Sequence, residues 1–391
     1  MNHSLAPSGL PGIDWAARHM PLLADTFAEV GSAFAGLRLA MTIHIEPKTA
    51  VLCQYLVAAG AQMTLTGNIG TTQPDTAEAL RALGVVVLGA RDDTVLEREA
   101  HLDAMLAQRP DLVLDNGGDL VIRLIEGAPR SPDFRGATEE TTTGAFRIRA
   151  LDASPDFPVV VINDSRLKLL VENEFGVGQS IVQGFMNATN LMIPGQRIGV
   201  VGYGPCGKGT ADTLRALGAS VTVAEIDPFR QLDALMRGHA VADLDAVLAA
   251  SDAVFLATGA RQVITEEHLP SLRDGIVLVG VGHEGRELDI AALRAASGEV
   301  VSLSPAGADA DARLLHRLTD GREVVVLHST HMINLTAAGG NPIQAMDLGL
   351  ALQARSLAAI AGGDVADGVD AVPSRVDRVL AEGLVRLLSR R

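Results

Sequence analysis

Two successive series of strand-like runs, each run followed by a helical pattern, most strongly constrain the fold of this 391-residue chain. The runs of the first series are Leu37–Ile43, Gln62–Leu65, Val85–Leu88, Leu112–Leu114 and Val159–Ile162. Those of the second series are Ile198–Gly202, Val221–Glu225, Ala253–Ala257, Ile276–Val281, Val300–Leu303 and Val324–Leu327. Strands that alternate with helices are typical of βαβ units, in which helices cover both faces of a parallel sheet. The pattern predicts an α/β protein with two doubly wound parallel-sheet domains.

Glycine-bearing segments mark where the chain would pass between the two domains. Phe175–Gly178 lies between the two series, and Ala337–Gly340 follows the second. Glycine tolerates the backbone changes that a hinge requires. We therefore expect one domain over residues 1–179, a second over residues 180–337, and a helical segment over residues 338–391 that returns to the first domain.

Composition and charge exclude several classes of protein. The net charge of −15 argues against nucleic acids and anionic membrane surfaces as partners. The first residues, MNHSLAPSGLPGIDW, lack the basic and apolar regions of a secretion signal, and runs such as Ile276–Val281 are too short to span a bilayer. The two cysteines, Cys53 and Cys206, lie in unrelated segments, so a cytoplasmic location is expected.

Lysine is rare in this chain. There are 29 arginines and three lysines, at positions 48, 168 and 208. A desolvated lysine can lose its proton, whereas arginine stays charged. The three lysines are therefore candidates for chemistry, although neutral surface lysines retained by chance are the alternative.

A glycine motif follows the first strand of the second series. Gly202, Gly204 and Gly207 form G-x-G-x-x-G between that strand and a helical pattern over Thr210–Leu217. In dinucleotide-binding folds the first glycine makes a tight turn, the second admits the pyrophosphate, and the third lets helix and strand pack closely. The pyrophosphate then meets unpaired amides at the helix N-terminus. The context predicts a Rossmann domain; a glycine-rich turn without a ligand is the alternative.

An acidic residue at the end of the next strand indicates which dinucleotide binds. Glu225 lies about 20 residues beyond the motif, where a carboxylate accepts a hydrogen bond from the ribose 2′-hydroxyl. Glu225 and Asp227 would repel a 2′-phosphate, so NAD is favoured over NADP. Arg230 is the one nearby residue whose charge would instead favour NADP.

Polar residues follow several strands of the first series, at the sheet edge where doubly wound folds bind ligands. His44 follows the first strand, Asp115–Asp119 the fourth, and Asn163–Asp164 the fifth, with Lys168 a little beyond. Glu139–Gly144 places two carboxylates before three hydroxyls at a predicted helix start. A nicotinamide needs a carbinol and a group that takes its proton. Each residue also has a structural alternative, as a helix cap, a turn residue or a core histidine.

These motifs together resemble S-adenosylhomocysteine hydrolase, from about Trp15 to Pro373. The segments that carry the resemblance are Glu139–Gly144 (EETTTG), Asn163–Ser165 (NDS), Gly202–Gly209 (GYGPCGKG), Glu225–Pro228 (EIDP), Gly282–His283 and Asn334–Leu335. The segment Ile43–Ala50 (IHIEPKTA) resembles the short archaeal and Thermotoga type of this family.

The resemblance implies a reaction on a purine nucleoside or nucleoside thioether. Tightly bound NAD oxidises the ribose C3′-hydroxyl, which makes the C4′ proton acidic. A base removes that proton, the C5′ substituent is eliminated, water adds to the enone, and NADH reduces C3′ again. The resemblance also implies a homo-oligomer, either a tetramer or a dimer, and no metal ion is expected.

The resemblance assigns roles to individual residues. Lys168, Glu172 and Asn173 would surround the 3′-hydroxyl, Glu140 would hold the ribose hydroxyls, His44 would handle protons near C5′, and His283 would lie beside substrate and nicotinamide. Asn341 and Met346 would contact the substrate. The cofactor contacts, besides the glycine motif and Glu225, would be Thr141, Thr142, Thr143, Asn173, Cys206, Arg230, Thr258, Gly282 and Asn334.

The chain departs from the family pattern near C5′. Asn116 stands where the family has the second aspartate of Asp-Asp-Gly-Gly-Asp, and an amide cannot transfer that proton. Asn341 replaces the histidine of Gly-His-Pro and Glu172 replaces an aspartate. The chain is also expected to lack the family's C-terminal extension. We therefore expect an enzyme with an altered leaving group, which dehydrates a nucleoside to its 4′,5′-unsaturated product in specialised nucleoside metabolism. The alternatives are a true hydrolase of S-adenosylhomocysteine or S-inosylhomocysteine, and a non-catalytic NAD-binding regulator.

Glu46 and Lys48 indicate which purine base the substrate carries. If both reach the purine edge, Glu46 accepts from N1–H and Lys48 donates to O6, which suits a 6-oxopurine. An ordinary pair on the protein surface is the alternative.

Overall fold

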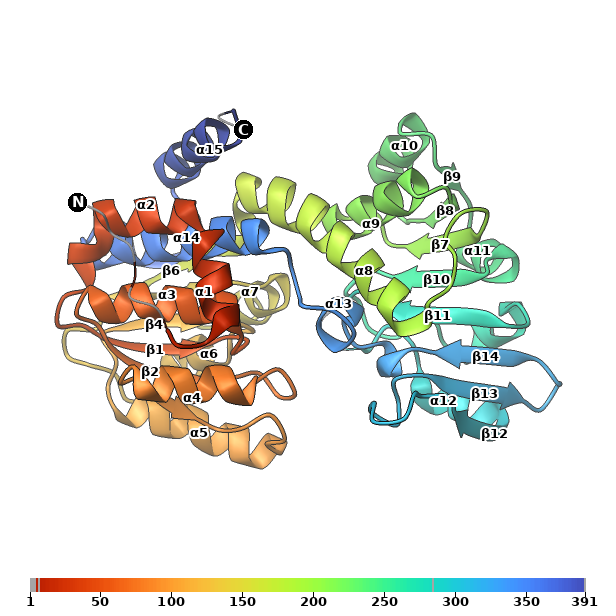
Figure 1. Cartoon of the computed structure of the whole chain (residues 1–391), viewed down its shortest axis with the longest axis horizontal. Helices are drawn as coiled ribbons and strands as arrows, with labels where there is room; N and C mark the ends of the chain where they lie inside the picture. The colour runs from red at the N-terminus through yellow and green to blue at the C-terminus, as the bar shows by residue number, and fades with distance from the viewer. Residues whose placement is uncertain (1–4, 6–7, 283–284, 390–391) are drawn as a thin grey trace. The chain divides into compact units, whose positions relative to one another are not determined.

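The computed structural model describes residues 5, 8–282 and 285–389 of the chain. These form two compact units, one made of Met1–Leu169 with Ile343–Arg391 and one of Leu170–Pro342 (Figure 1). The chain thus changes unit at 169/170 and 342/343, whereas the boundaries expected from the sequence lie at 179/180 and 337/338. The residues from Ile343 onward belong to the same unit as the residues up to Leu169.

The first unit is built on a seven-stranded sheet of order β15-β6-β5-β4-β1-β2-β3, in which every neighbouring pair is parallel. Its strands are β1 (Arg38–Thr42), β2 (Gln62–Thr66), β3 (Val86–Leu88), β4 (Leu112–Asp115), β5 (Gly136–Glu139), β6 (Pro158–Val161) and β15 (Gly368–Ala371). The predicted series is confirmed. The sequence did not predict β5 or β15, because GATE and GVDA lack an apolar run. The strand order reverses between β1 and β4, where doubly wound sheets bind ligands.

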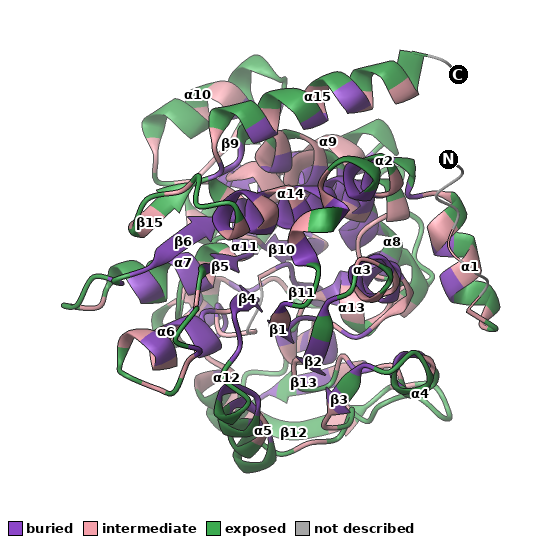
Figure 2. Ribbon diagram, turned by 90° about the vertical axis from the view of Figure 1, so that its left-hand side faces the viewer, coloured by how far each residue is buried: buried purple, intermediate pink, exposed green. Residues whose placement is uncertain are grey.

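Helices cover this sheet and complete its core. They are α1 (Pro11–Arg18), α2 (Pro21–Val30), η1 (Gly31–Phe34), α3 (Pro47–Ala58), α4 (Pro74–Ala82), α5 (Val95–Ala107), α6 (Asp119–Ile125), α7 (Thr142–Arg149), η2 (Ile162–Asp164), α14 (Ile343–Ala361) and α15 (Ser374–Ser389). Proline at the first turn starts α1 to α4, since its missing N–H is not needed there. Helix α14 is apolar nearly all round and packs against α2 and β5. Strands β4, β5 and β6 are buried along their whole length (Figure 2).

The second unit has an eight-stranded sheet of order β12-β13-β14-β11-β10-β7-β8-β9. Its strands are β7 (Arg197–Val201), β8 (Ser220–Ala224), β9 (Ala240–Val241), β10 (Ala253–Leu256), β11 (Ile276–Gly280), β12 (Ser297–Ser302), β13 (Leu314–Leu318) and β14 (Glu323–Val326). The run from β14 to β9 is parallel, as predicted, but β12, β13 and β14 pair antiparallel. The sequence did not predict β13, which a short turn through Asp320–Gly321 joins to β14.

Alternation along the central strands buries both faces of this sheet. Val254 belongs to one core cluster, and its neighbour Phe255 belongs to the cluster on the opposite face. The helices around them are η3 (Lys168–Val177), α8 (Gly178–Thr189), α9 (Pro205–Ala216), α10 (Pro228–Met236), α11 (Leu244–Ala250), η4 (Glu266–Ser271), α12 (Ile290–Ala296), η5 (His328–Thr330) and α13 (Ile333–Thr336).

The segment that links the first unit to the second is a ten-residue π-helix, η3. π-Helical turns are rare and are frequently found at functional sites. Gly178, in the predicted hinge, serves close packing rather than an unusual backbone angle. A Cβ atom there would lie 2.5 Å from the carbonyl carbon of Gly209.

Candidate active site

Four strands of the first unit end at polar residues that the sequence singled out. His44 follows β1, Asn116 follows β4, Glu140 follows β5, and Lys168 opens η3 beyond β6. Because these strands are parallel, their carboxyl ends lie at one edge of the sheet. Glu140 and Lys168 are buried.

Glu140 is the centre of this group. Lys168 Nζ donates to Glu140 Oε1 at 3.3 Å, and the two side chains are 4% and 8% exposed. Asn116 Nδ2 donates to Glu140 Oε2 at 2.9 Å. Burial opposes ionisation of Glu140, but Lys168, the hydrogen bond from Asn116 and the charge of His44 outweigh it and lower the pKa of Glu140. The site therefore holds an ionised carboxylate 3.3 Å from the amino group of Lys168.

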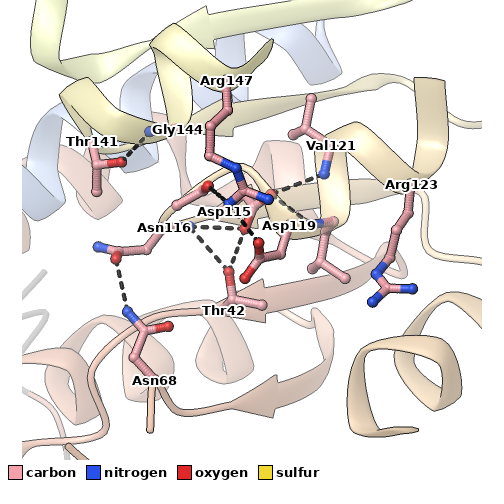
Figure 3. A network of polar contacts seen from close by, with 12 residues as sticks. Thr42, Asn68, Asp115, Asn116, Asp119, Val121, Arg123, Thr141, Gly144 and Arg147 are labelled. Carbon is pink, nitrogen blue, oxygen red and sulfur yellow. Dashed lines mark hydrogen bonds and ion pairs between the residues drawn. The ribbon is translucent and has the colours of Figure 1, made fainter. Parts of the chain in front are cut away.

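The orientation of the Asn116 amide is fixed from both sides. Its Oδ1 accepts from Asn68 Nδ2 at 2.9 Å (Figure 3), while its Nδ2 faces Glu140. Arg98 Nη2 in turn donates to Asn68 Oδ1 at 2.9 Å. Sequence reasoning missed Asn68 and Arg98. The position of Asn68, two residues after β2, was the available signal, since polar residues at strand ends had identified the others.

Two further carboxylates lie in register on β4 and β5, directly before these residues. Asp115 accepts from the Thr42 hydroxyl at 2.5 Å and from the Val121 amide at 2.9 Å (Figure 3). Glu139 Oε1 accepts from the amide and hydroxyl of Thr141, both at 2.7 Å, while its buried Oε2 has no hydrogen-bond partner. Burial and the charge of Asp115 raise the pKa of Glu139 to about 8. Glu139 is therefore mainly protonated at neutral pH.

This raised pKa predicts how stability depends on pH. The folded protein holds a proton on Glu139 that the unfolded chain releases above pH 4.5, so stability from this group falls as pH rises from about 5 to about 8. A Glu139→Gln variant removes that loss, which amounts to about 1.4 kcal/mol per pH unit in the middle of the range. Urea unfolding at several pH values measures the slope, with Glu299→Gln at an exposed ion pair as control. Parallel curves for wild type and Glu139→Gln would contradict the assignment.

Glu46 and Lys48 form a buried pair, so the alternative of a surface pair is wrong. Glu46 caps α3 and its Oε2 lies 3.0 Å from Lys48 Nζ, with the side chains 12% and 8% exposed. Burial raises the pKa of Glu46, the charge of Lys48 lowers it, and the charge of Glu140 raises it. The last effect shows that the pair lies within electrostatic range of Glu140.

Two of the three threonines after Glu140 make hydrogen bonds within the first unit. Thr141 Oγ1 accepts from Gly144 N at 2.8 Å and caps α7, which confirms the capping alternative (Figure 3). Thr142 Oγ1 accepts from Asn163 Nδ2 at 2.6 Å, whereas Thr143 is half-buried. Met346 is half-buried in α14. Their contacts with cofactor or substrate stay predictions.

The glycine motif in the second unit has the geometry that its spacing predicts. Gly202 has φ +91°, and a Cβ atom at Gly207 would lie 2.0 Å from the Gly202 carbonyl oxygen. A Cβ atom at Gly204 would have Arg230 Nη1 as its nearest neighbour, at 3.8 Å. Gly204 is the N-cap of α9 and has no side-chain cap, so the first amides of that helix are available to an anion.

Glu225 is held rigidly beside this loop. Its Oε2 accepts from Tyr203 N at 2.7 Å, and its Oε1 accepts from Ile226 N at 2.7 Å and Asp227 N at 3.0 Å. Arg230 lies 3.9 Å from Glu225 and 3.8 Å from Asp227, so two carboxylates balance its charge. This acidic setting fits the ribose hydroxyls of NAD.

A buried amide in α13 of the second unit also fits the cofactor. Asn334 Nδ2 donates to Ser180 Oγ and to Asn341 Oδ1, both at 3.2 Å, while its buried Oδ1 has no partner. Such an oxygen can accept from a carboxamide, as nicotinamide carries. Asn341 Nδ2 donates to Glu172 Oε1 at 3.3 Å. Asn173 shares the π-helix with Glu172.

Glu287, which sequence reasoning missed, organises the remaining predicted cofactor residues. It accepts from Thr258 N at 2.7 Å and Thr258 Oγ1 at 2.5 Å, and a Cβ atom at Gly282 would lie 2.5 Å from its Oε2. Cys206 is half-buried in the first turn of α9. His283 lies outside the described residues.

Among the described residues, no group of three or more His, Cys, Asp and Glu side chains could hold a metal ion. Within the same residues, none of the helices has the length and apolar character needed to cross a membrane.

Comparison with known proteins agrees with the geometry. The family model described as S-adenosyl-L-homocysteine hydrolase matches residues 1–134, and that of its NAD-binding domain matches residues 173–340. The chain is 38% identical to S-inosyl-L-homocysteine hydrolase of Methanopyrus kandleri, over 97% of this chain and 90% of the relative. It is 37% identical to the adenosylhomocysteinases of Thermococcus kodakarensis (97% and 90% covered) and Thermotoga maritima (87% and 84% covered). The chain belongs to the S-adenosyl-L-homocysteine hydrolase family, whose members are NAD-dependent enzymes.

Proposed function

We propose that this enzyme hydrolyses the thioether of a nucleosidyl homocysteine, with S-inosylhomocysteine favoured over S-adenosylhomocysteine. The observation that carries the proposal is the buried group of Lys168, Glu140 and Asn116 in a chain whose second unit retains the complete dinucleotide loop. Two relatives that align with nearly the whole chain bear the names of such hydrolases. When bound, NAD supplies reversible hydride acceptance at the ribose C3′.

In the proposed reaction, Lys168 and Glu140 act at the ribose. Lys168 Nζ, as the neutral amine, takes the proton of the 3′-hydroxyl, releases it to a water molecule, and afterwards removes the C4′ proton. Glu140, kept ionised by its neighbours, accepts from a ribose hydroxyl and holds Lys168 in place. Both side chains are buried, so bulk water does not compete for these protons.

Asn116 changes how protons move at C5′. Its amide carries no titratable proton, and both of its ends are engaged, with Asn68 and with Glu140. We assign proton transfer at C5′ to His44 alone, which protonates the departing homocysteine sulfur and accepts a proton from the water that adds to the enone. Asn116 instead helps to keep Glu140 ionised.

Glu46 and Lys48 are proposed to select the base. With a 6-oxopurine, Glu46 accepts from N1–H and Lys48 donates to O6; both charged groups are already held 3.0 Å apart. A Lys48→Met variant is expected to lose about 10- to 100-fold in kcat/KM on S-inosylhomocysteine, since a hydrogen bond from a charged group contributes about 1.5 to 3 kcal/mol. Steady-state assays on both thioethers measure this. An equal preference for the two bases in the wild type would contradict the assignment.

Dehydration of a nucleoside remains the second candidate, and Asn116 is the observation that favours it. An amide in place of an acid weakens proton transfer to a leaving group and to water at C5′. Such an enzyme would release the 4′,5′-unsaturated nucleoside after eliminating its 5′-hydroxyl.

One assay separates these candidates. The NAD-loaded enzyme is incubated with S-inosylhomocysteine and S-adenosylhomocysteine, and free thiol and nucleoside are quantified by mass spectrometry. Homocysteine released over many turnovers is the expected result. No thiol, together with a product lighter by one water from inosine or adenosine, would replace hydrolysis by dehydration. No reaction with any of these compounds would favour the regulatory alternative.

A further inference from the structure

A network of charged residues lies within the second unit and takes no part in the proposed chemistry. It joins three carboxylates to a lysine, an arginine and a histidine. Its members are Glu174 of η3, Lys208 and Asp212 of α9, Asp233 of α10, and Arg237 and His239, which follow α10. The network thus ties the π-helix to the helix that begins at the glycine motif.

Glu174 is the member contributed by the π-helix. Its Oε2 lies 3.5 Å from Lys208 Nζ, and its Oε1 lies 3.5 Å from Arg237 Nη1. The carboxylate is only 12% exposed, so water screens these contacts less than those of a surface pair. Two cations from different elements therefore hold one carboxylate.

Both cations are fixed independently of Glu174. Lys208 Nζ lies 3.2 Å from Asp233, and Arg237 contacts Asp212 at 2.8 Å and Asp233 at 3.1 Å. Asp212 also contacts Nε2 of the buried His239 at 2.7 Å. Glu174 therefore binds between two cations whose positions are already set, which reduces the entropy lost in forming its contacts.

The backbone of Glu174 contacts the same helix. A Cβ atom at Gly209 would lie 1.6 Å from the Glu174 carbonyl oxygen, so only glycine permits this approach. A Cβ atom at Gly178, just after the π-helix, would lie 2.5 Å from the Gly209 carbonyl carbon. The backbone therefore packs closely against α9 both at Glu174 and at Gly178.

Glu172 precedes Glu174 by two residues and has different partners. Its Oε1 accepts from Asn341, which contacts the buried Asn334. In a helix that closes i→i+5 hydrogen bonds, residues two apart point to roughly opposite sides. Because both residues belong to one π-helix, the contacts of Glu174 on one side of that helix fix the position of Glu172 on its opposite side.

We propose that Glu174 is a positioning residue, which locks the π-helix onto the cofactor-binding helix and thereby places Glu172 and Asn173 for the redox step. The expected effect of Glu174 on C3′ oxidation rests on the proposed function, whereas its effect on the opening of the π-helix does not. A Glu174→Gln variant keeps the shape but loses the charge that Lys208 and Arg237 hold. We expect its π-helix to open more often and its C3′ oxidation to slow by about 10- to 100-fold, as small displacements of positioned groups do. Glu174→Asp should restore part of the rate.

Two measurements on the full-length, NAD-loaded protein test this proposal. Hydrogen exchange reports the opening of amides 170–177, and stopped-flow absorbance at the NADH band reports reduction of bound NAD after mixing with inosine or adenosine. The matched control is Glu299→Gln, which removes an exposed carboxylate 2.6 Å from Arg317 in the same unit. The expected result is exchange at least about tenfold faster, confined to the π-helix, with slower reduction and unchanged NAD affinity.

The contrary outcomes are distinct. Unchanged exchange at 170–177 in Glu174→Gln would overturn the proposal, and so would an equal increase over the whole second unit, because Glu174 would then be only a stability residue. A wild-type rate of NAD reduction would overturn its catalytic part. If the wild type gives no NADH signal with either nucleoside, the proposed function fails, while the exchange data still decide whether Glu174 locks the π-helix.

Discussion

Replacing Lys168 by methionine is expected to lower kcat for homocysteine release by about 10²- to 10⁴-fold, the usual contribution of a general acid or base. Methionine retains most of the apolar stem but lacks the Nζ atom that lies 3.3 Å from Glu140. The 3′-hydroxyl then lacks the amine that takes its proton. Initial rates with a saturating thioether measure the loss, and the expected change lies in kcat rather than KM.

The same substitution leaves Glu140 as a buried charge with one partner fewer, which costs about 3 to 5 kcal/mol of stability. The double variant Lys168→Met with Glu140→Gln tests the effect on stability, because it removes both partners of the pair. We expect it to regain stability in urea unfolding and to remain inactive. Recovery of activity in the double variant would show that Lys168 serves stability alone.

Replacing Gly207 by alanine is expected to yield protein without bound NAD and to lower the free energy of unfolding by about 1 to 3 kcal/mol, as overpacking does. The new Cβ atom would lie 2.0 Å from the Gly202 carbonyl oxygen, so helix α9 must move away from β7. The amides at its N-terminus then leave the pyrophosphate. Loss of two such hydrogen bonds costs about 3 kcal/mol, or about 100-fold in NAD affinity.

Gly204→Ala is the matched comparison. The space at Gly204 accepts a Cβ atom, with Arg230 Nη1 the nearest atom at 3.8 Å. This variant should therefore unfold like the wild type yet bind NAD more weakly, because the added methyl group meets the cofactor and not the protein. Thermal unfolding without NAD and titration with NAD measure the two effects. Equal destabilisation by both variants would contradict the distinction.

The fold was largely predictable because its main signals are local. Strands that are buried on both faces can be recognised from their apolar residues. The glycine motif identifies the unit formed by β7 and α9. Strands β5 and β15 escaped prediction since their four residues carry little apolar pattern, and their burial or pairing comes from neighbours distant in sequence. The π-helix escaped as well, because no sequence period distinguishes it from an α-helix.

The candidate site was predictable where residues follow strands and unpredictable where partners come from afar. Lys168, Glu140 and Asn116 were singled out by position, and the structure joins them directly. Arg98 and Glu287 were missed, since each acts through contacts with residues about 30 positions away. The same holds for Glu174, whose cationic partners Lys208 and Arg237 lie 34 and 63 positions further along the chain.

The most direct test of transient oxidation at C3′ is exchange of the C4′ proton in heavy water. NAD-loaded enzyme is incubated with inosine or adenosine in deuterium oxide, and the recovered nucleoside is analysed by mass spectrometry and proton NMR. One deuterium at C4′ is expected with the wild type and none with Lys168→Met. Recovery of both nucleosides without deuterium at C4′, from wild-type enzyme shown to contain NAD, would contradict it.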